Sequence, residues 1–219
     1  MTAYQNIGEL FYEDRLEVIS DFPEWGSTRI EEARRKLEEL YEKREAMLGE
    51  PSRAETSYYW TSYVLRRLGF CFSVAEMSPV DTDVRPDFAL FYDAEEFLRA
   101  KPYRGEREYF SRSLGVLKSL GWDEELDTVD EETGSTAAIE LDRFIRDTGV
   151  TWGILTNGRE WRLYHRDTSG LLNSYYQVNL VNALMSNQLD DFKYFWMVFT
   201  PEGMGDLSYG DTVINRLRQ

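Results

Sequence analysis

Cysteine and histidine are nearly absent from this sequence, in which each occurs once, as Cys71 and His165. A single cysteine excludes an intrachain disulfide and a cysteine-based zinc site. A single histidine, at the end of a predicted strand, leaves little room for histidine acid–base chemistry. No apolar run approaches the length of a membrane span, and the N-terminus lacks the basic-then-apolar order of a signal peptide. We therefore expect a cytoplasmic protein with no membrane partner.

Lysine is also scarce. The sequence has 40 acidic and 25 basic residues and a net charge of −15, and only five of the basic residues are lysines. Taken alone, this balance argues against nucleic-acid binding, because phosphate contacts need clustered Lys and Arg. An acidic surface with arginine in place of lysine also fits work in concentrated salt, where self-repulsion is screened. On that halophile-like interpretation, net charge says little about partners.

Hydrophobic residues at 42% and aromatic residues at 15% predict a globular protein with a real core. The length of 219 residues favours one domain, with room for a helical extension. Capping-box patterns at Thr28–Glu31 and Ser52–Glu55 predict two helices, which end near Gly49 and Gly69. Further along we predict strands at 70–76, 85–92, 114–120 and 175–178. We predict helices at 94–112, interrupted near Pro102 and Gly105, at 135–147 and at 180–199.

The strongest local signal is the stretch Thr148–Tyr164, TGVTWGILTNGREWRLY. Asn157-Gly158 separates two runs rich in branched and aromatic residues, a pattern that predicts a β-hairpin with a two-residue type I′ turn. Such a turn needs positive φ at both central residues. Together with the alternating helices and strands, the hairpin predicts an α/β fold with a mixed central sheet and helices on both faces.

Several segments occur in an order and at a spacing that carry a resemblance to a known family. They are LFYEDRL near the start, ETSYYWTSYVLRRLGF, RPDFALF, the frame VL…W…LD at 116–127, and the hairpin. This set resembles the N-terminal nuclease-like (PD-(D/E)xK, restriction endonuclease-like) domain of type I restriction subunits and of fused restriction–methylation (type IIG) enzymes.

The resemblance implies a restriction endonuclease-like core at 51–200, after an N-terminal helical extension at 1–50. Residues 201–219 are then a C-terminal tail or the lead-in to a connector. The implied role lies in restriction–modification or a related phage-defence system. The implied partners are double-stranded DNA, bound weakly in isolation, and further domains or subunits of a restriction system.

In this family an Asp begins the second core strand and a Glu-x-Lys pair lies on the third. The two strands are neighbours in the sheet, so the carboxylates converge on Mg²⁺, which polarises the scissile phosphate, and the lysine lies near that phosphate. The resemblance therefore implies Asp87, in Arg85-Pro86-Asp87-Phe88, as a catalytic residue and metal ligand. Glu55 corresponds to an acidic residue of the family's first core helix. It is also the third residue after Ser52, where a capping box would use it in any case.

The third strand departs from the family pattern. Aligned on Val116-Leu117 and Trp122, the family's glutamate falls on Lys118 and its lysine on Leu120. Using Lys118 as the catalytic lysine instead puts Val116 where the glutamate belongs, so the Glu-x-Lys pair is lost in either register.

The following helix departs as well. The family often carries Gln-x-x-x-Tyr before Thr-Gly-Val, whereas this chain has Glu140 and Phe144. We therefore expect a degenerate active site whose remaining role is DNA contact or scaffolding. The candidate DNA-facing residues are Arg85, Lys118, Arg159 and Arg162, each of which is equally readable as an ordinary surface charge.

Two other functions stay open. An active endonuclease with relocated carboxylates requires Mg²⁺ bound by Asp87 and at least one of Glu55, Asp123 or Asp127. A protein-interaction module would use the aromatic helix near the C-terminus as a partner surface. Exposed Phe195 and Trp196 side chains would favour this last hypothesis, and their burial would remove its main support.

Overall fold

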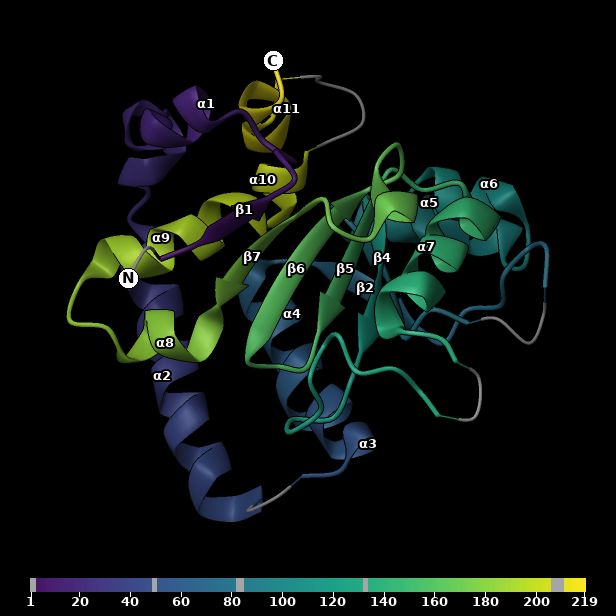
Figure 1. Ribbon diagram of the computed structural model, residues 1–219, viewed down its shortest axis with the longest axis horizontal. Coiled ribbons are helices and arrows are strands. Elements are labelled where there is room, and N and C mark those ends of the chain that lie inside the picture. The colour runs from purple at the N-terminus through teal and green to yellow at the C-terminus, as the bar shows by residue number, and fades with distance from the viewer. Residues whose placement is uncertain (1–2, 49–50, 82–84, 132–133, 206–210) are drawn as a thin grey trace.

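The computed structural model describes residues 3–48, 51–81, 85–131, 134–205 and 211–219, and their centre is a seven-stranded mixed sheet (Figure 1). The strand order is β1-β7-β6-β5-β4-β3-β2, and β4 and β5 are parallel while the other neighbours are antiparallel. The strands are β1 (Gln5–Ile7), β2 (Cys71–Val74), β3 (Phe88–Phe91), β4 (Gly115–Ser119), β5 (Trp152–Thr156), β6 (Glu160–His165) and β7 (Tyr175–Asn179).

Helices cover both faces of this sheet, which confirms the predicted α/β class with a mixed central sheet. The α-helices are α1 (Glu13–Glu17), α2 (Arg29–Leu48), α3 (Arg53–Glu55), α4 (Ser62–Leu68), α5 (Ala94–Ala100), α6 (Arg107–Ser111), α7 (Ala137–Thr148), α8 (Leu180–Met185), α9 (Leu189–Val198), α10 (Pro201–Met204) and α11 (Val213–Leu217). Short 3₁₀ turns are η1 (Ile19–Asp21), η2 (Pro23–Gly26), η4 (Lys101–Tyr103) and η5 (Ser169–Leu171), and η3 (Thr56–Thr61) is π-helical.

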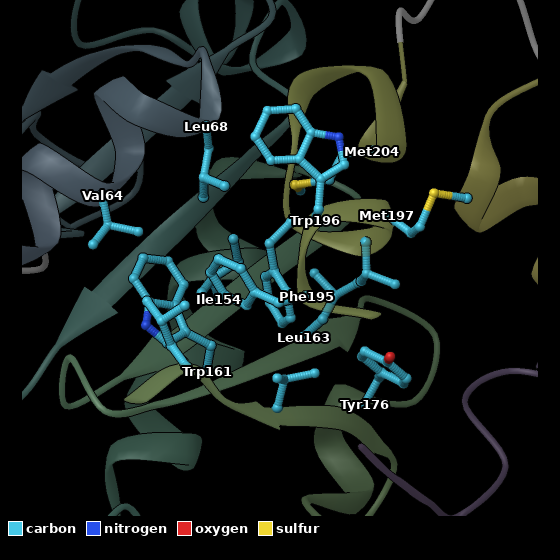
Figure 2. Packing of buried hydrophobic residues seen from close by; sticks show 14 of the residues in the cluster. Val64, Leu68, Ile154, Trp161, Leu163, Tyr176, Phe195, Trp196, Met197 and Met204 are labelled. Carbon is cyan, nitrogen blue, oxygen red and sulfur yellow. The ribbon is translucent and has the colours of Figure 1, made fainter. Parts of the chain in front are cut away.

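Side-chain alternation along the strands divides the core into two clusters. Leu117 of β4 joins the larger cluster, beneath α2, α4 and α9, whereas its neighbour Val116 joins the smaller one, beneath α5, α6 and α7. Figure 2 shows Ile154, Leu163 and Phe195 lying together within the larger cluster. The sheet is therefore buried on both faces around β4 and β5, where the candidate site residues lie.

The predicted hairpin is present, but its predicted turn is wrong. Thr156 pairs with Trp161, so four residues separate the paired positions, and Gly158 has positive φ while Asn157 does not. Asn157 instead accepts hydrogen bonds at Oδ1 from the backbone N–H groups of Arg159 and Glu160, at 3.1 and 2.8 Å. A side-chain turn of this kind replaces the backbone turn that Asn-Gly favours in isolation.

The turn is also contacted by Trp60 of η3, which lies outside the hairpin. Trp60 Nε1 donates to the Gly158 carbonyl at 2.7 Å, and the rings of Trp60 and Trp122 pack against Gly158. A Cβ at Gly158 would lie 2.8 Å from Trp60 and 3.0 Å from Trp122. This tertiary contact explains why the loop is longer than the local sequence predicts.

The predicted single helix over 180–199 is also wrong, because α8 ends at Met185 and α9 begins at Leu189. Arg34 of α2 donates to the carbonyl groups of Leu184 and Ser186, at the C-terminal end of α8. The Ser186 hydroxyl accepts from the Gln188 N–H at 3.1 Å. These contacts satisfy backbone and side-chain groups at the break, so the chain turns there.

Both ends of the chain pack into the same structure. Strand β1, which the sequence pattern did not predict, pairs antiparallel with β7 and places Gln5 opposite Gln177. The Tyr12 N–H donates to the Leu217 carbonyl at 3.0 Å, and Arg216 forms an ion pair with Glu24 at 2.6 Å. The described parts of 1–50 and 201–219 thus add a sheet edge and a helical cover to the core.

We expect Gly158→Ala to lower the free energy of unfolding by about 3 kcal/mol, because it adds a steric clash to a positive φ. Gly105 is a matched control, since its φ of +85° is close to the +88° of Gly158 while nothing lies within 4 Å of its Cβ position. Gly105→Ala should cost about 1 kcal/mol. Urea denaturation measures both, and equal losses would contradict the packing argument.

Candidate functional site

Asp87 and Lys118 are brought together by two neighbouring strands. Asp87 immediately precedes β3, Lys118 lies on β4, and the two strands pair antiparallel with Phe88 opposite Leu117. The register therefore sets Asp87 against the Lys118–Ser119 end of β4. The prediction that these two segments are neighbours in one sheet is confirmed.

The Asp87 carboxylate is held by a backbone amide and an arginine. Oδ2 accepts from the Ser119 N–H at 2.7 Å and from Arg53 Nη2 at 3.2 Å. Arg53 also donates from Nε to the Ser119 carbonyl at 2.8 Å, so it bridges α3, β3 and β4. The sequence offers no reason to single out Arg53, because nothing near it distinguishes it from Arg66 and Arg67 of the same predicted helix.

Lys118 is buried beneath α7 and paired with a carboxylate. Its side chain is 5% exposed, and Nζ lies 2.5 Å from Oε2 of Glu140, whose side chain is 43% exposed. The Nζ atom also lies 5.8 Å from the centre of the Phe144 ring. A buried ammonium needs a counter-charge, and Glu140 supplies it.

Glu55 caps the N-terminus of α3 together with Ser52, which confirms the predicted capping box. Its Oε2 accepts from the Ser52 N–H at 2.9 Å and from the Ser52 hydroxyl at 2.8 Å, while the Glu55 N–H donates to Ser52 Oγ at 3.3 Å. The backbone hydrogen bond from Ser52 is the main cause that lowers the pKa of Glu55. Asp87 lines a groove of about 580 Å³, but neither Glu55 nor Lys118 lines it.

The donor set does not fit a divalent cation. Each of the carboxylates Asp87 and Glu140 faces a protein cation, Arg53 and Lys118 respectively. Within the described ranges, no group of three or more Asp, Glu, His or Cys side chains is placed to hold a metal ion. Ordinary Mg²⁺ sites use several oxygen ligands with water, and an ammonium beside them opposes the ion's charge.

Arg162 is buried and committed to Asp127, which the sequence analysis named as a relocated-carboxylate candidate. Arg162 Nη1 and Nη2 donate to the two oxygens of Asp127 at 2.6 and 2.8 Å, and Nε donates to Oε1 of Gln177 at 2.5 Å. The hydrogen bonds from Arg162 are the main cause that lowers the pKa of Asp127. The Arg162 side chain is 6% exposed and that of Asp127 is 74% exposed.

The other candidates lie nearer the surface. Arg85 is exposed, and Arg159 is half-buried with its guanidinium carbon 6.0 Å from the centre of a Trp122 ring. Asp123 is exposed, and its carboxylate makes no hydrogen bond to another residue that the structure describes. Phe195 and Trp196 of α9 are buried, which removes the main support for a partner surface on that helix.

Comparisons with known proteins leave the family resemblance as a hypothesis. No family model, no curated protein and no solved structure matches the chain. Among the described residues, no helix is both long enough and apolar enough to cross a membrane. The function of the chain must therefore be inferred from its own residues.

We expect Glu140→Gln to lower the free energy of unfolding by about 2 kcal/mol, because it leaves the buried Lys118 ammonium without a counter-charge. Glu39→Gln is the matched control, since Glu39 pairs with Arg35 on the exposed face of α2. Exposed pairs of this kind often contribute nothing measurable. Urea denaturation at low salt compares the two, and an equal effect of both substitutions would refute the role of Lys118–Glu140.

His165 provides a pH-dependent term in stability. Burial and then the nearby Arg218 charge lower its pKa from 6.5 to about 4, and its ring packs against Trp152 at 4.7 Å. The folded state therefore keeps His165 neutral, whereas the unfolded chain binds a proton below about pH 6.5. With respect to His165, the free energy of unfolding is therefore highest above pH 6.5, and it decreases as the pH falls toward 4.

A ¹H NMR titration tests this directly, because the single histidine gives one assignable Hε1 signal. We expect a midpoint near 4 in the folded protein and near 6.5 in urea. A folded midpoint near 6.5 would show that the imidazole is not desolvated.

Proposed function

We propose that this chain is a nuclease-fold domain of a restriction–modification or related DNA-defence system that contacts double-stranded DNA without cleaving it. The observation that carries the proposal is the ion pair of Lys118 with Glu140, at the end of β4 that faces Asp87, the residue immediately before β3. In the family that the sequence resembles, this place holds carboxylates and a metal ion. Here it holds two salt bridges.

Loss of cleavage follows from the charges. Metal-dependent phosphodiester hydrolysis needs carboxylates that converge on a cation, and the cation then supplies Lewis-acid activation of the phosphate. In this chain Arg53 neutralises Asp87 and Lys118 neutralises Glu140. The pairs leave no surplus negative charge between the strands to attract Mg²⁺.

DNA contact is assigned to the surface arginines of the same region. Arg85 and Arg159 reach the surface, whereas Lys118 and Arg162 are buried in ion pairs. Two arginines neutralise few phosphates, so binding by the isolated chain should be weak and sensitive to salt. Further domains or subunits of a restriction system would supply the remaining contacts.

The second candidate function is an active Mg²⁺-dependent endonuclease with relocated carboxylates. Asp123 is the observation that favours it, because this exposed carboxylate is not engaged by another described residue. Of the other two candidates, Glu55 serves the helix cap and Asp127 pairs with Arg162. This function therefore requires Asp123 to reach Asp87 by a rearrangement of its loop.

We expect no cleavage of duplex DNA in the presence of Mg²⁺ or Mn²⁺, and no ion binding by titration calorimetry in concentrated salt. The Asp87→Ala variant should behave like the wild type in both assays. Robust cleavage that is abolished both by EDTA and by Asp87→Ala would overturn the proposal in favour of the active enzyme.

Duplex binding is tested separately by fluorescence anisotropy at low salt. The double variant Arg85→Ala/Arg159→Ala should weaken binding, whereas Arg35→Ala/Arg99→Ala should not, because these two exposed arginines lie on α2 and α5. Duplex binding that is absent in the wild type would remove the DNA-contact role.

A further inference from the structure

A groove runs between the first core helical segment and the β2 edge of the sheet. Its volume is about 580 Å³. One wall is formed by α3, η3 and α4, and the other by β2, the last strand of the sheet, and the start of β3. Its lining residues include Arg53, Tyr58 and Arg66 on the helical wall and Phe72, Val74 and Phe88 on the sheet wall.

Tyr58 lines the helical wall of the groove, and two further exposed tyrosines lie on the same helical segment. Tyr58, Tyr59 and Tyr63 are 70%, 52% and 38% exposed. Tyr58 and Tyr59 lie edge to face with their ring centres 4.9 Å apart. Three large aromatic side chains on one short helical segment form a surface that presents ring faces and hydroxyl groups to a ligand.

The same segment is locally basic in a strongly acidic chain. Arg66 and Arg67 are exposed, and neither forms an ion pair with a carboxylate in the part of the chain that the structure describes. At the other end of the groove the lining carboxylate Asp87 is paired with Arg53. Arg53 keeps its second terminal nitrogen, Nη1, outside the hydrogen bonds to Asp87 and Ser119. The acid of this segment, Glu55, is held in its capping box.

The orientation of the tyrosines is fixed by hydrogen bonds on the opposite side of the π-helical turn η3. Trp60 Nε1 donates to the Gly158 carbonyl, Thr61 Oγ1 lies 3.3 Å from Ser119 Oγ, and Thr56 Oγ1 accepts from the Trp122 N–H at 3.2 Å. Because these inward side chains are anchored to the sheet and its loops, the intervening tyrosines must face outward. Single π-turns within helices are frequent at functional sites.

We infer that this groove binds an unpaired stretch of DNA. Its bases would stack on Tyr58 and its neighbours, and its phosphates would pair with Arg53 and Arg66. Aromatic rings beside cations are the combination that binds single strands without sequence preference. The apolar sheet wall with Phe72 and Val74 suits unstacked bases, whereas a duplex would present only its phosphates. The inference deepens the proposed DNA contact, and it rests on that function for the choice of DNA as the ligand.

The charge arrangement supports this ligand over an acidic peptide. Arg66 Cζ lies 5.4 Å from the centre of the Phe72 ring, and Arg67 Cζ lies 5.3 Å from that of Tyr63. Each guanidinium therefore lies beside an aromatic ring, where a base can stack on both. An acidic peptide would use the charges but leave the exposed rings unmatched.

The experiment uses fluorescence anisotropy of a labelled single strand of about twelve nucleotides. We expect Tyr58→Ala and Arg66→Ala each to weaken binding at least about fivefold, and Tyr58→Phe to retain it within about twofold, because the ring remains. Tyr12→Ala and Arg35→Ala are matched controls at exposed positions beside α1 and on α2, and should not change affinity.

The salt dependence provides a second readout. Two arginine–phosphate contacts, from Arg53 and Arg66, predict a slope of about −1.4 for the logarithm of affinity against the logarithm of salt concentration. Arg66→Ala should reduce the magnitude of that slope by about 0.7. Circular dichroism of each variant verifies that the fold is intact.

The inference is overturned if single strands do not bind, or if Tyr58→Ala and Arg66→Ala bind as well as the controls. Self-association of the chain that Tyr58→Ala abolishes, without strand binding, would overturn it by assigning the groove to a protein. Its failure is distinguishable from failure of the proposed function. The latter is measured by duplex binding through Arg85 and Arg159 and by the cleavage assay, neither of which uses Tyr58.

Discussion

The buried ammonium of Lys118 imposes the constraint on which the arrangement of this structure depends. It lies on β4, in the interior of the sheet, where an unpaired charge would be strongly destabilising. The chain that follows β4 must therefore return over the sheet with a carboxylate that faces Lys118. Helix α7 does this, because Glu140 lies one turn after the N-cap Thr136 and Phe144 lies one turn further on. The same helix connects β4 to its parallel neighbour β5. The crossover connection therefore places Glu140 over Lys118, and the ion pair in turn holds the helix on the sheet.

Three ion pairs with a common design tie loops and helices to the sheet. They are Lys118–Glu140, Arg162–Asp127 and Arg53–Asp87. In the first two, the cation is buried and the carboxylate is substantially exposed. The desolvation penalty then falls mainly on one partner, which makes such pairs less costly than fully buried ones. Some of the surface carboxylates therefore have a structural role, as counter-charges for cations of the sheet.

Local patterns predicted much of this fold, and tertiary contacts explain the rest. The Ser52 capping box and the hairpin around Asn157 were predicted because their signals lie within a few residues of one another. The turn type was not predictable, since Trp60, nearly one hundred residues away, sets it. The break before α9 likewise depends on Arg34 of α2. In the site, the resemblance gave the pairing of the Asp87 and Lys118 segments, but the engagement of Asp87 by Arg53 and the burial of Arg162 require the folded chain.

Catalysis and strand binding place different demands on a protein. Hydrolysis at a metal centre needs several atoms held in one converging geometry, so it depends on each of them. Binding an unpaired strand needs only exposed rings and a few cations along a groove, each of which acts largely on its own. A net charge of −15 repels DNA at long range, so a surface on this chain must act at short range. In the proposed groove, stacking of bases on tyrosine and arginine would act at this short range, and the arginine–phosphate contacts would supply the salt-dependent part of the affinity.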